Sequence, residues 1–345
     1  MSQKSRRGGR SRARSGHATI ADVAARADVA PITVSRVIND PTTVSERLRA
    51  RVEAAITELG YVPNRLAGGL ASASTRVIPI IVPSLANIVF IEVIQGAQTT
   101  LEGAGYQILL GNTDYDLERE ASLVETLLGW SPAGMIVAGL RHLEPTVKRL
   151  RHWGRPLVEV MEYGGECLDM NVGLSHEAAG AAQAEHLVER GYRDILYVGA
   201  RLARDYRAEQ RYLGHRRTLE AAGIEPKLLT YEEASTYELG GRALLQARHD
   251  HPGLEAVHFA NDDLAVGAIL NAQRHRIAVP GQIAIAGFNG LPISAHTTPR
   301  LTTVVSPRYR IGQLAAEMLL ARLHGTPFES ATIDVGFELA VREST

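Results

Sequence analysis

From residue 77 onwards, short apolar runs alternate with segments in which apolar residues recur at helical spacing. The apolar runs predict buried strands, and the segments with period 3.6 predict helices. In the first half of this region we expect strands at Val77–Val82, Tyr106–Leu110, Met135–Ala138 and Leu157–Met161, and helices at Phe90–Ala104, Leu117–Leu128 and Pro145–His152. This alternation predicts a parallel sheet with helices on both faces.

The same alternation then starts again. We expect helices at Glu177–Arg190, Glu209–Ala222, Leu239–Arg248 and Leu264–Arg274, and strands at Ile195–Gly199, Leu228–Tyr231, Val257–Ala260 and Ile283–Gly287. Two successive α/β units of similar size predict two lobes. We expect the closing helix, Ile311–Leu323, and the strand Ile333–Val341 to cross back between the lobes. Open parallel sheets bind ligands at the carboxyl ends of their strands, so the cleft between the lobes is the expected pocket.

Residues 19–60 follow a different pattern, that of three short helices. Thr19 is the expected N-cap of the first, Pro31 lies in the first turn of the second, and Ser45 with Glu46 opens the third, which Gly60 ends. Asp28 to Ala30 form the turn between the first two helices. Two helices joined by about four residues and followed by a third form a helix-turn-helix, although a three-helix bundle that binds no nucleic acid has the same spacing.

In a helix-turn-helix the second helix enters the major groove of DNA with its N-terminus first. Ala30, Pro31, Ile32, Thr33, Ser35 and Arg36 are therefore the residues expected to reach DNA. Arg36 has the donors for a bidentate contact with guanine. Thr33, Ser35, Asn39 and Ser45 are expected to bind phosphates, and Thr19 is also among the residues expected to bind DNA.

The net charge of −1 conceals an uneven distribution along the chain. Residues 1–18 contain six basic residues and no acidic ones, and the first 71 residues together carry a charge of +6. The remainder therefore carries −7. A basic end joined to an acidic body suits a protein that approaches DNA by one face. The tail is too polar to fold, and a disordered solubilising leader would have the same composition.

Composition and motifs exclude several other classes of protein. We find no membrane span and no signal peptide, so we expect a cytoplasmic location. The single Cys167 excludes internal disulfides and is expected to be buried. No catalytic motif is present, and we expect neither cofactor nor metal. His215, His249 and His251 are the histidines with metal-binding potential, but exposed positions at helix ends explain them better.

The N-terminal region resembles the headpiece of the lactose/galactose repressor (LacI) family. DVA, TVSRVIN, VS and LGYVPNRLA occur in the family's order and spacing. The resemblance implies that Tyr61 and Asn64 contact the DNA backbone and that residues 64–71, Ala67 among them, form a hinge helix in the minor groove. Leu70 would then be the wedge between two base pairs.

The hinge contains Gly68 and Gly69, which depart from the family's pattern. Each glycine costs a helix up to about 1 kcal/mol relative to alanine, so we expect the hinge to be unfolded without operator DNA. Replacing both glycines with alanine should tighten operator binding and blunt the response to the effector.

The body resembles the same family's effector-binding core, which shares its fold with periplasmic sugar-binding proteins. The clearest segments are HFANDDLAVGA, AIAGFNG, PRLTTV and HLVERGYRDILYVG. Polar or aromatic residues expected in the cleft follow the ends of strands: Ser84, Phe90, His142, Arg211, Asn261 and Asn289. Each would equally serve as a structural group with its hydrogen bonds satisfied. The resemblance implies that Arg211, Asn261 and Asn289 contact the effector.

Two departures from the family bear on the effector. Asn289 stands where family members that bind neutral sugars usually have aspartate, which favours an anionic ligand with a carboxylate held by Arg211. Ser235 stands where the family often has an aromatic ring, which favours an acyclic polyol. PSLANIVFIEVIQG, CLDMNVG and LYVGARL further resemble the gluconate-utilisation repressors of the family. We therefore expect gluconate or a close sugar acid as effector.

The sequence predicts a basic tail (1–18), a helix-turn-helix domain (19–63), a hinge (64–75) and a two-lobed α/β core (76–345). With no heptad tail, we expect a homodimer that binds a palindromic operator and represses transcription until the effector weakens binding. Three alternatives remain: another sugar as effector, activation of transcription, and a sugar-binding receptor for transport. The receptor would need a signal peptide and no headpiece.

Overall fold

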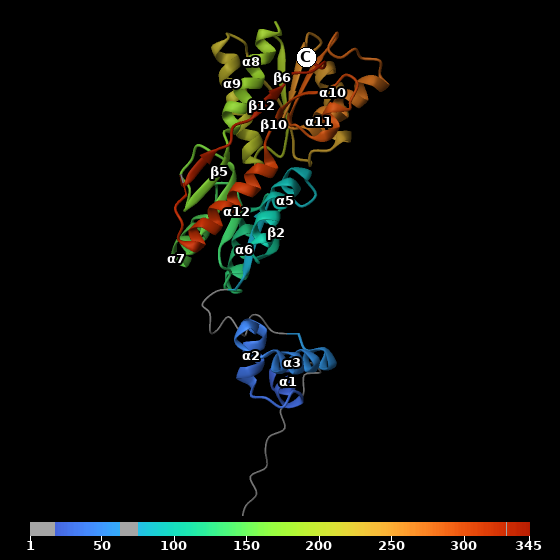
Figure 1. The fold of residues 1–345 in the computed structure, drawn as a ribbon. Helices are drawn as coiled ribbons and strands as arrows, with labels where there is room; N and C mark the ends of the chain where they lie inside the picture. Colours follow the sequence, from blue (N-terminus) through green and yellow to red (C-terminus); the bar gives the residue numbers. More distant parts are fainter. Residues whose placement is uncertain (1–17, 63–74, 329) are drawn as a thin grey trace, which may run out of the picture. The chain divides into compact units, whose positions relative to one another are not determined.

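The computed structural model describes residues 18–62, 75–328 and 330–345, in two compact units that divide between residues 73 and 74 (Figure 1). The first unit holds α1 (Ile20–Arg26), α2 (Pro31–Asn39), the 3-10 turn η1 (Pro41–Thr43) and α3 (Glu46–Leu59). The three helices expected from the apolar spacing are confirmed, and η1 is an addition to them.

The helix ends of this unit form as the sequence predicts. The Thr19 hydroxyl accepts a hydrogen bond from Asp22 N, while the Asp22 carboxylate accepts one from Thr19 N, which completes a capping box. Gly60 ends α3 in the left-handed region, at φ +57°, and Tyr61 N donates to Ile56 O. Val23, Val34 and Val52 are buried at the centre of the unit, so each helix contributes to one small core.

The second unit begins with a lobe built on a fully parallel six-stranded sheet in the order β11-β5-β4-β3-β1-β2. Its strands are β1 (Val77–Val82), β2 (Gln107–Asn112), β3 (Met135–Ala138), β4 (Leu157–Glu162), β5 (Met170–Leu174) and β11 (Thr332–Asp334). Its helices are α5 (Ile88–Gly103), α6 (Leu117–Leu128), α7 (Glu144–Trp153) and α12 (Arg308–His324). The expected strands and helices of this half are confirmed, and β5 was not expected.

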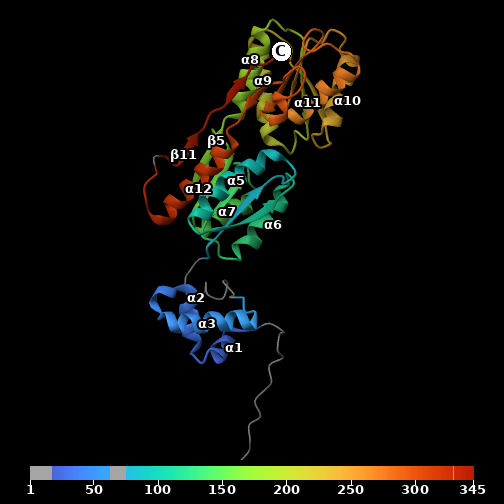
Figure 2. The same cartoon turned by 45° about the vertical axis from the view of Figure 1, so that its right-hand side comes forward.

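Side chains alternate between the two faces of this sheet. Ile80 and Ile136 pack beneath α5 and α12, whereas Ile81 and Val137 pack against α6 and α7. Figures 1 and 2 both show α12 lying along α5. The sheet is therefore buried on both faces, as the continuous apolar strands predict.

The other lobe has a second six-stranded sheet in the order β12-β10-β9-β8-β6-β7, in which only β12 runs antiparallel to its neighbour. The strands are β6 (Ile195–Ala200), β7 (Lys227–Tyr231), β8 (Ala256–Phe259), β9 (Ala284–Asn289), β10 (Thr302–Val305) and β12 (Glu338–Ala340). The helices are α8 (His176–Glu189), α9 (Tyr206–Ala221), α10 (Tyr237–Asp250), α11 (Asp262–Arg274) and the 3-10 turn η2 (Pro292–Ala295). The second α/β unit is thus confirmed, with β10 as an addition.

The chain passes between the lobes three times: from β5 to α8, from β10 to α12 and from β11 to β12. The expectation that the closing helix and the last strand cross back is confirmed. The single strand predicted at Ile333–Val341 is wrong, because β11 and β12 belong to different sheets. Gly336, at φ +64°, lies in the segment that separates them.

The backbones of helices α8 and α9 are in direct contact. This contact holds α9 close to the segment in which the chain passes from β5 into α8. A Cβ at Gly180 would collide with the backbone of Arg211, and one at Gly214 would collide with the backbone of Glu177. Glycine at both positions is therefore required for this approach. In the described ranges, no helix is long and apolar enough to cross a membrane.

Candidate functional site

The outward face of α2 is the candidate surface for DNA. Pro31, Ile32 and Arg36 are exposed, and 62% of the Ile32 surface is accessible. Thr33 and Ser35 are half-buried beside them. Ala30 caps α2 without a side-chain hydrogen bond, so the first backbone N–H groups of the helix keep no side-chain acceptor there. Such an N-terminus suits a phosphate oxygen.

The remaining residues predicted to bind DNA lie at the edges of this unit. Thr19 and Ser45 are exposed N-caps of α1 and α3, and Tyr61 packs half-buried against the small core. Asn39 is the last residue of α2. Asn64, Ala67, Gly68, Gly69 and Leu70 lie outside the described residues, so the hinge stays a prediction.

A pocket of about 690 Å³ lies between the two lobes, which we call the large cleft pocket. Of the predicted cleft residues, Ser84 and Asn261 line it, and Ser235 lies beside them. The Asn261 amide donates to Ser235 Oγ over 2.7 Å and accepts from Leu264 N as the N-cap of α11. Asp114, Asp205 and Asp263 also line this pocket, with Arg201 as their cationic neighbour. The large cleft pocket is therefore rich in hydrogen-bond acceptors.

A second pocket between the lobes, of about 150 Å³, has a different charge, and we call it the arginine pocket. Arg141, Arg204 and Arg207 line it, together with the acidic residues Asp116, Glu120 and Glu162. Tyr115 lines both pockets; burial first, and then the charge of Asp205, raise its pKa to about 12. Three of the four arginines that line the two pockets thus lie in the smaller one.

Arg211 is buried, with 4% of its surface accessible, and lines neither pocket. Its Nη1 donates to His176 Nδ1 over 2.9 Å, and its guanidinium lies 4.1 Å from the centre of the Phe288 ring. Because arginine only donates, His176 Nδ1 accepts and His176 Nε2 carries the proton given to Met161 O. The predicted effector contact of Arg211 needs this arrangement to change, and it stays a prediction.

Phe90 and Asn289 are also buried and absent from the pocket linings. Phe90 supports Arg207, whose guanidinium lies 5.5 Å from the ring centre. Asn289 ends β9 at φ +120°, a conformation rare for any residue except glycine, and its carbonyl accepts a hydrogen bond from Arg308 Nη1. The buried positions of Phe90 and Asn289 do not test whether these residues contact the effector, so both contacts stay predictions.

His142 forms the centre of a buried triad with two glutamates. Its Nδ1 lies 2.6 Å from Glu120 Oε1 and its Nε2 lies 3.0 Å from Glu159 Oε1, and 1% of the His142 side chain is accessible. Burial lowers its pKa, but the hydrogen bonds and charges of the two glutamates outweigh burial and raise it to about 10. Both ring nitrogens are occupied, so the geometry favours the structural alternative over an effector contact.

Two expectations about single residues are wrong. His215 is fully buried and not at an exposed helix end; its Nδ1 lies 2.9 Å from His258 Nδ1. It lies in the middle of α9, on the face where its ring packs against Tyr197 of β6 and His258 of β8. Cys167 is half-buried, since it lies in the loop between β4 and β5. In the described part of the chain, no group of three metal-binding side chains comes together.

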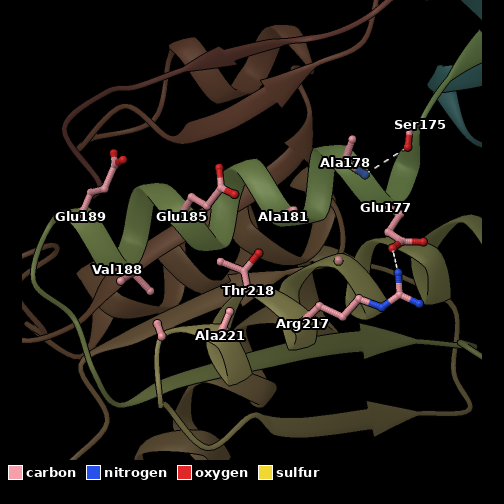
Figure 3. A pocket seen from close by; sticks show the side chains of 12 residues that line it. Ser175, Glu177, Ala178, Ala181, Glu185, Val188, Glu189, Arg217, Thr218 and Ala221 are labelled. Atoms are coloured by element: carbon pink, nitrogen blue, oxygen red, sulfur yellow. Dashed lines mark hydrogen bonds and ion pairs between the residues drawn. The ribbon is translucent and has the colours of Figure 1, made fainter.

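A third hollow, of about 690 Å³, lies along α8 and α9 within one lobe (Figure 3). Figure 3 shows Ala181 and Val188 on α8 and Ala221 on α9 among its lining residues, and one of the two dashed lines marks the pair between Glu177 and Arg217. Its lining is mostly small or acidic and belongs to one lobe only. This groove therefore lacks the convergent donors of the pockets between the lobes.

Sequence reasoning missed Arg207 and Glu162, whose side chains meet between the lobes. Arg207 Nη1 donates to Glu162 Oε1 over 3.0 Å. Arg207 lies one helical turn before Arg211 on α9, but the predicted helix began only at Glu209. The helical spacing of Arg207 and Arg211 was the available signal, and it was missed because the start of the helix was predicted three residues too late.

Two family models match this chain. Bacterial regulatory proteins of the lacI family match residues 19–64, and a periplasmic binding protein-like domain matches residues 184–345. The HTH-type transcriptional regulator GntR of Pseudomonas aeruginosa is 41% identical over 96% of this chain and 96% of its own length. The regulator GntR of Escherichia coli K12 is 39% identical over 92% of this chain and 96% of its length.

The fold is similar to that of a LacI-family transcriptional regulator from Silicibacter pomeroyi. That crystal structure superimposes with a TM-score of 0.90 at 36% identity, and covers 95% of this chain and 99% of its own. The likeness extends over both units, so it includes the α2 face as well as the cleft.

Proposed function

This chain belongs to the LacI family of bacterial regulatory proteins, and on that premise we propose that a sugar acid, gluconate or a close derivative, controls its affinity for operator DNA. It is a DNA-binding transcriptional regulator of the repressor type. The observation that carries the proposed effector is the gathering of Arg141, Arg204 and Arg207 in one pocket of the cleft. Guanidinium groups in a partly enclosed site bind carboxylates strongly.

The large cleft pocket suits the polyol part of such a ligand. Ser235 and Asn261 offer a hydroxyl and an amide, and Asp114, Asp205 and Asp263 offer acceptors for ligand hydroxyls. The small side chain of Ser235 leaves space for an acyclic ligand and offers no aromatic ring on which a sugar ring could stack. The names of the relatives, GntR, are consistent with an effector of this class.

A neutral sugar is the second candidate, and the same carboxylates favour it. Three acidic side chains against one arginine make the large cleft pocket unfavourable for an anion placed there. The two candidates differ in charge, so a charged and an uncharged polyol of equal length distinguish them.

We further propose a homodimer that binds a palindromic operator through two headpieces. Exposed apolar side chains on the core support an assembly of this kind. Ile88 and Ile91 on α5 are 43% and 38% accessible, and Leu110 on the edge strand β2 is 47% accessible. Analytical ultracentrifugation of the full chain tests the assembly, and a monomer at micromolar concentration contradicts it.

The decisive experiment measures binding to DNA from upstream of the protein's own gene by fluorescence anisotropy, at several salt concentrations, with gluconate, with sorbitol and without either. We expect tight, salt-sensitive binding that gluconate weakens and sorbitol does not. Binding that sorbitol or another neutral sugar weakens instead supports the second candidate. Lack of binding to any upstream DNA contradicts the role of the headpiece.

A further inference from the structure

Glu162 and Arg207 form a buried ion pair that joins the two lobes. Glu162 ends β4 in the first lobe and Arg207 lies in the first turn of α9 in the second. Their side chains are 7% and 10% accessible, and the Nη1–Oε1 distance is 3.0 Å. A buried ion pair contributes little net stability because both charges lose their hydration. Its position in the cleft therefore suggests a role beyond holding the lobes together.

Arg207 is positioned as a receptor for a carboxylate. Its guanidinium lies 5.5 Å from the ring centre of Phe90 and 5.9 Å from that of Tyr115, which hold it by cation–π contacts. Among the described residues, Glu162 is its one side-chain hydrogen-bond acceptor. Arginine has five N–H donors, so a carboxylate that approaches through the pocket finds donors still available.

The arginine pocket has the size and charge for the anionic end of a small ligand. Its volume of about 150 Å³ equals the space of roughly five water molecules. Of its carboxylates, Asp116 is engaged as the N-cap of α6 and Glu120 is paired with His142. Only Glu162 depends on an arginine of this pocket, so it is the carboxylate that an entering anion would replace.

We propose that Glu162 is an internal stand-in for the effector's carboxylate, and that an entering organic anion takes Arg207 from it. This inference rests on the proposed sugar-acid effector. It assigns the recognition of the acid group to Arg207, four residues from the predicted Arg211. Binding thereby exchanges an ion pair between the lobes for a contact with the ligand, which links occupancy of the pocket to the relation between the lobes.

The exchange leaves Glu162 buried without its cation. Burial is the main cause that raises the pKa of Glu162, and Asp205 raises it further, while Arg207 opposes both. The other charged or titratable groups lining this pocket are Arg141, Arg204, Tyr115, Tyr206, Asp116 and Glu120. When Arg207 turns to the ligand, its opposing influence weakens and Glu162 takes up a proton. Gluconate binding should therefore consume up to one proton per site and strengthen as the pH falls.

The test is isothermal titration of the full chain with potassium gluconate, with sorbitol as the uncharged probe, in two buffers of different ionisation enthalpy. Glu162→Gln keeps the shape of the internal group but removes its charge, so we expect gluconate to bind about tenfold more tightly and without proton uptake. Arg207→Gln should bind gluconate about 10- to 100-fold more weakly, and Arg207→Lys should recover part of the loss.

Arg242→Gln is the matched control, because Arg242 also pairs with a glutamate, Glu233 at 2.6 Å, but lines neither of the pockets between the lobes. It should leave proton uptake unchanged. Thermal unfolding and operator binding verify that each variant folds. If Arg207→Gln does not fold, Arg207→Lys and Glu162→Gln still test the role of the ion pair.

Two results would overturn the proposal, and they are distinguishable. If the wild type binds gluconate without proton uptake, and both Glu162→Gln and Arg207→Lys keep its affinity, the stand-in role is wrong and the sugar-acid effector stands. If the wild type binds no gluconate, 6-phosphogluconate or ketogluconate but its operator binding is intact, both the sugar-acid effector and the stand-in role are wrong.

Discussion

Arg211 Nη1 donates a hydrogen bond to His176 Nδ1 over 2.9 Å, at the point where the chain passes from β5 into α8. His176 in turn donates from Nε2 to Met161 O on β4. The arginine of one lobe is thus connected through a neutral histidine to the sheet of the other. Burial, followed by the charges of Arg211 and Arg207, holds the pKa of His176 well below its usual value, which keeps it a hydrogen-bond acceptor for the arginine.

His176→Ala should destabilise the core, because it leaves Arg211 Nη1 and Met161 O without their partner. Buried groups left unsatisfied cost about 1–3 kcal/mol, so we expect the free energy of unfolding in urea to fall by that amount. His249→Ala, at an exposed position on α10, is the control and should change it by less than about 0.5 kcal/mol. Equal effects of the two substitutions would contradict the role of His176.

The triad around His142 should make the stability of the first lobe depend on alkaline pH. The folded protein holds the pKa of His142 at about 10, above the value near 6.5 of the unfolded chain. Its contribution is therefore complete below pH 6.5 and is lost as the pH rises towards 10, by up to about 1.4 kcal/mol per pH unit. His142→Gln should lose this slope in urea unfolding followed by tryptophan fluorescence, whereas His152→Gln, exposed on α7, should keep it. A slope that persists in His142→Gln would assign it to other groups.

Local patterns predict the elements of this chain well, because they depend on neighbours in sequence. The apolar run Val77–Val82 forms β1 with those bounds, and the segment Leu117–Leu128 forms α6. Strand β5 escaped prediction because the polar Asn171, its second residue, interrupts the apolar run. In the structure Asn171 is buried and its amide donates to the carbonyls of Glu159 and Glu162, contacts that the sequence does not show.

Contacts between distant segments were the part that the sequence could not predict. Glu162 and Arg207 belong to different lobes, and only the passage of the chain between the sheets brings them together. His142 was placed correctly after β3, yet its role depends on Glu120 and Glu159 from two other elements. The position of a residue after a strand can thus be predicted from the sequence pattern, whereas the partners of its side chain, and whether it lines a pocket, cannot.

The pair of His215 and His258 should make the second lobe sensitive to acid. Both rings are fully buried, and burial holds the pKa of His215 down to about 3 and that of His258 well below its usual value. The unfolded chain binds protons below about pH 6.5 while the folded protein does not, so stability is lost as the pH falls.

We therefore expect the free energy of unfolding to decrease between pH 6.5 and 4, and the double variant His215→Leu with His258→Leu to flatten this decrease. Urea unfolding followed by circular dichroism measures it, with His296→Leu at an exposed site as the control. An undiminished acid slope in the double variant would show that other groups cause it.

Arg36 should carry part of the sequence preference of the headpiece. It is exposed on α2 beside Ile32, on the face that we propose for the major groove. A bidentate contact with guanine discriminates by about 1–3 kcal/mol, so Arg36→Ala should weaken operator binding about 10- to 100-fold and binding to scrambled DNA much less. Arg26→Ala is the matched control, because Arg26 is also exposed but is held by Glu58 through Nε at 2.9 Å and Nη2 at 2.6 Å. Removing that surface pair costs little stability, and it should change operator and scrambled binding alike. If anisotropy measurements show that Arg36→Ala weakens both DNAs equally, Arg36 binds phosphate, and the discrimination has to come from the apolar Pro31 and Ile32 against thymine methyl groups.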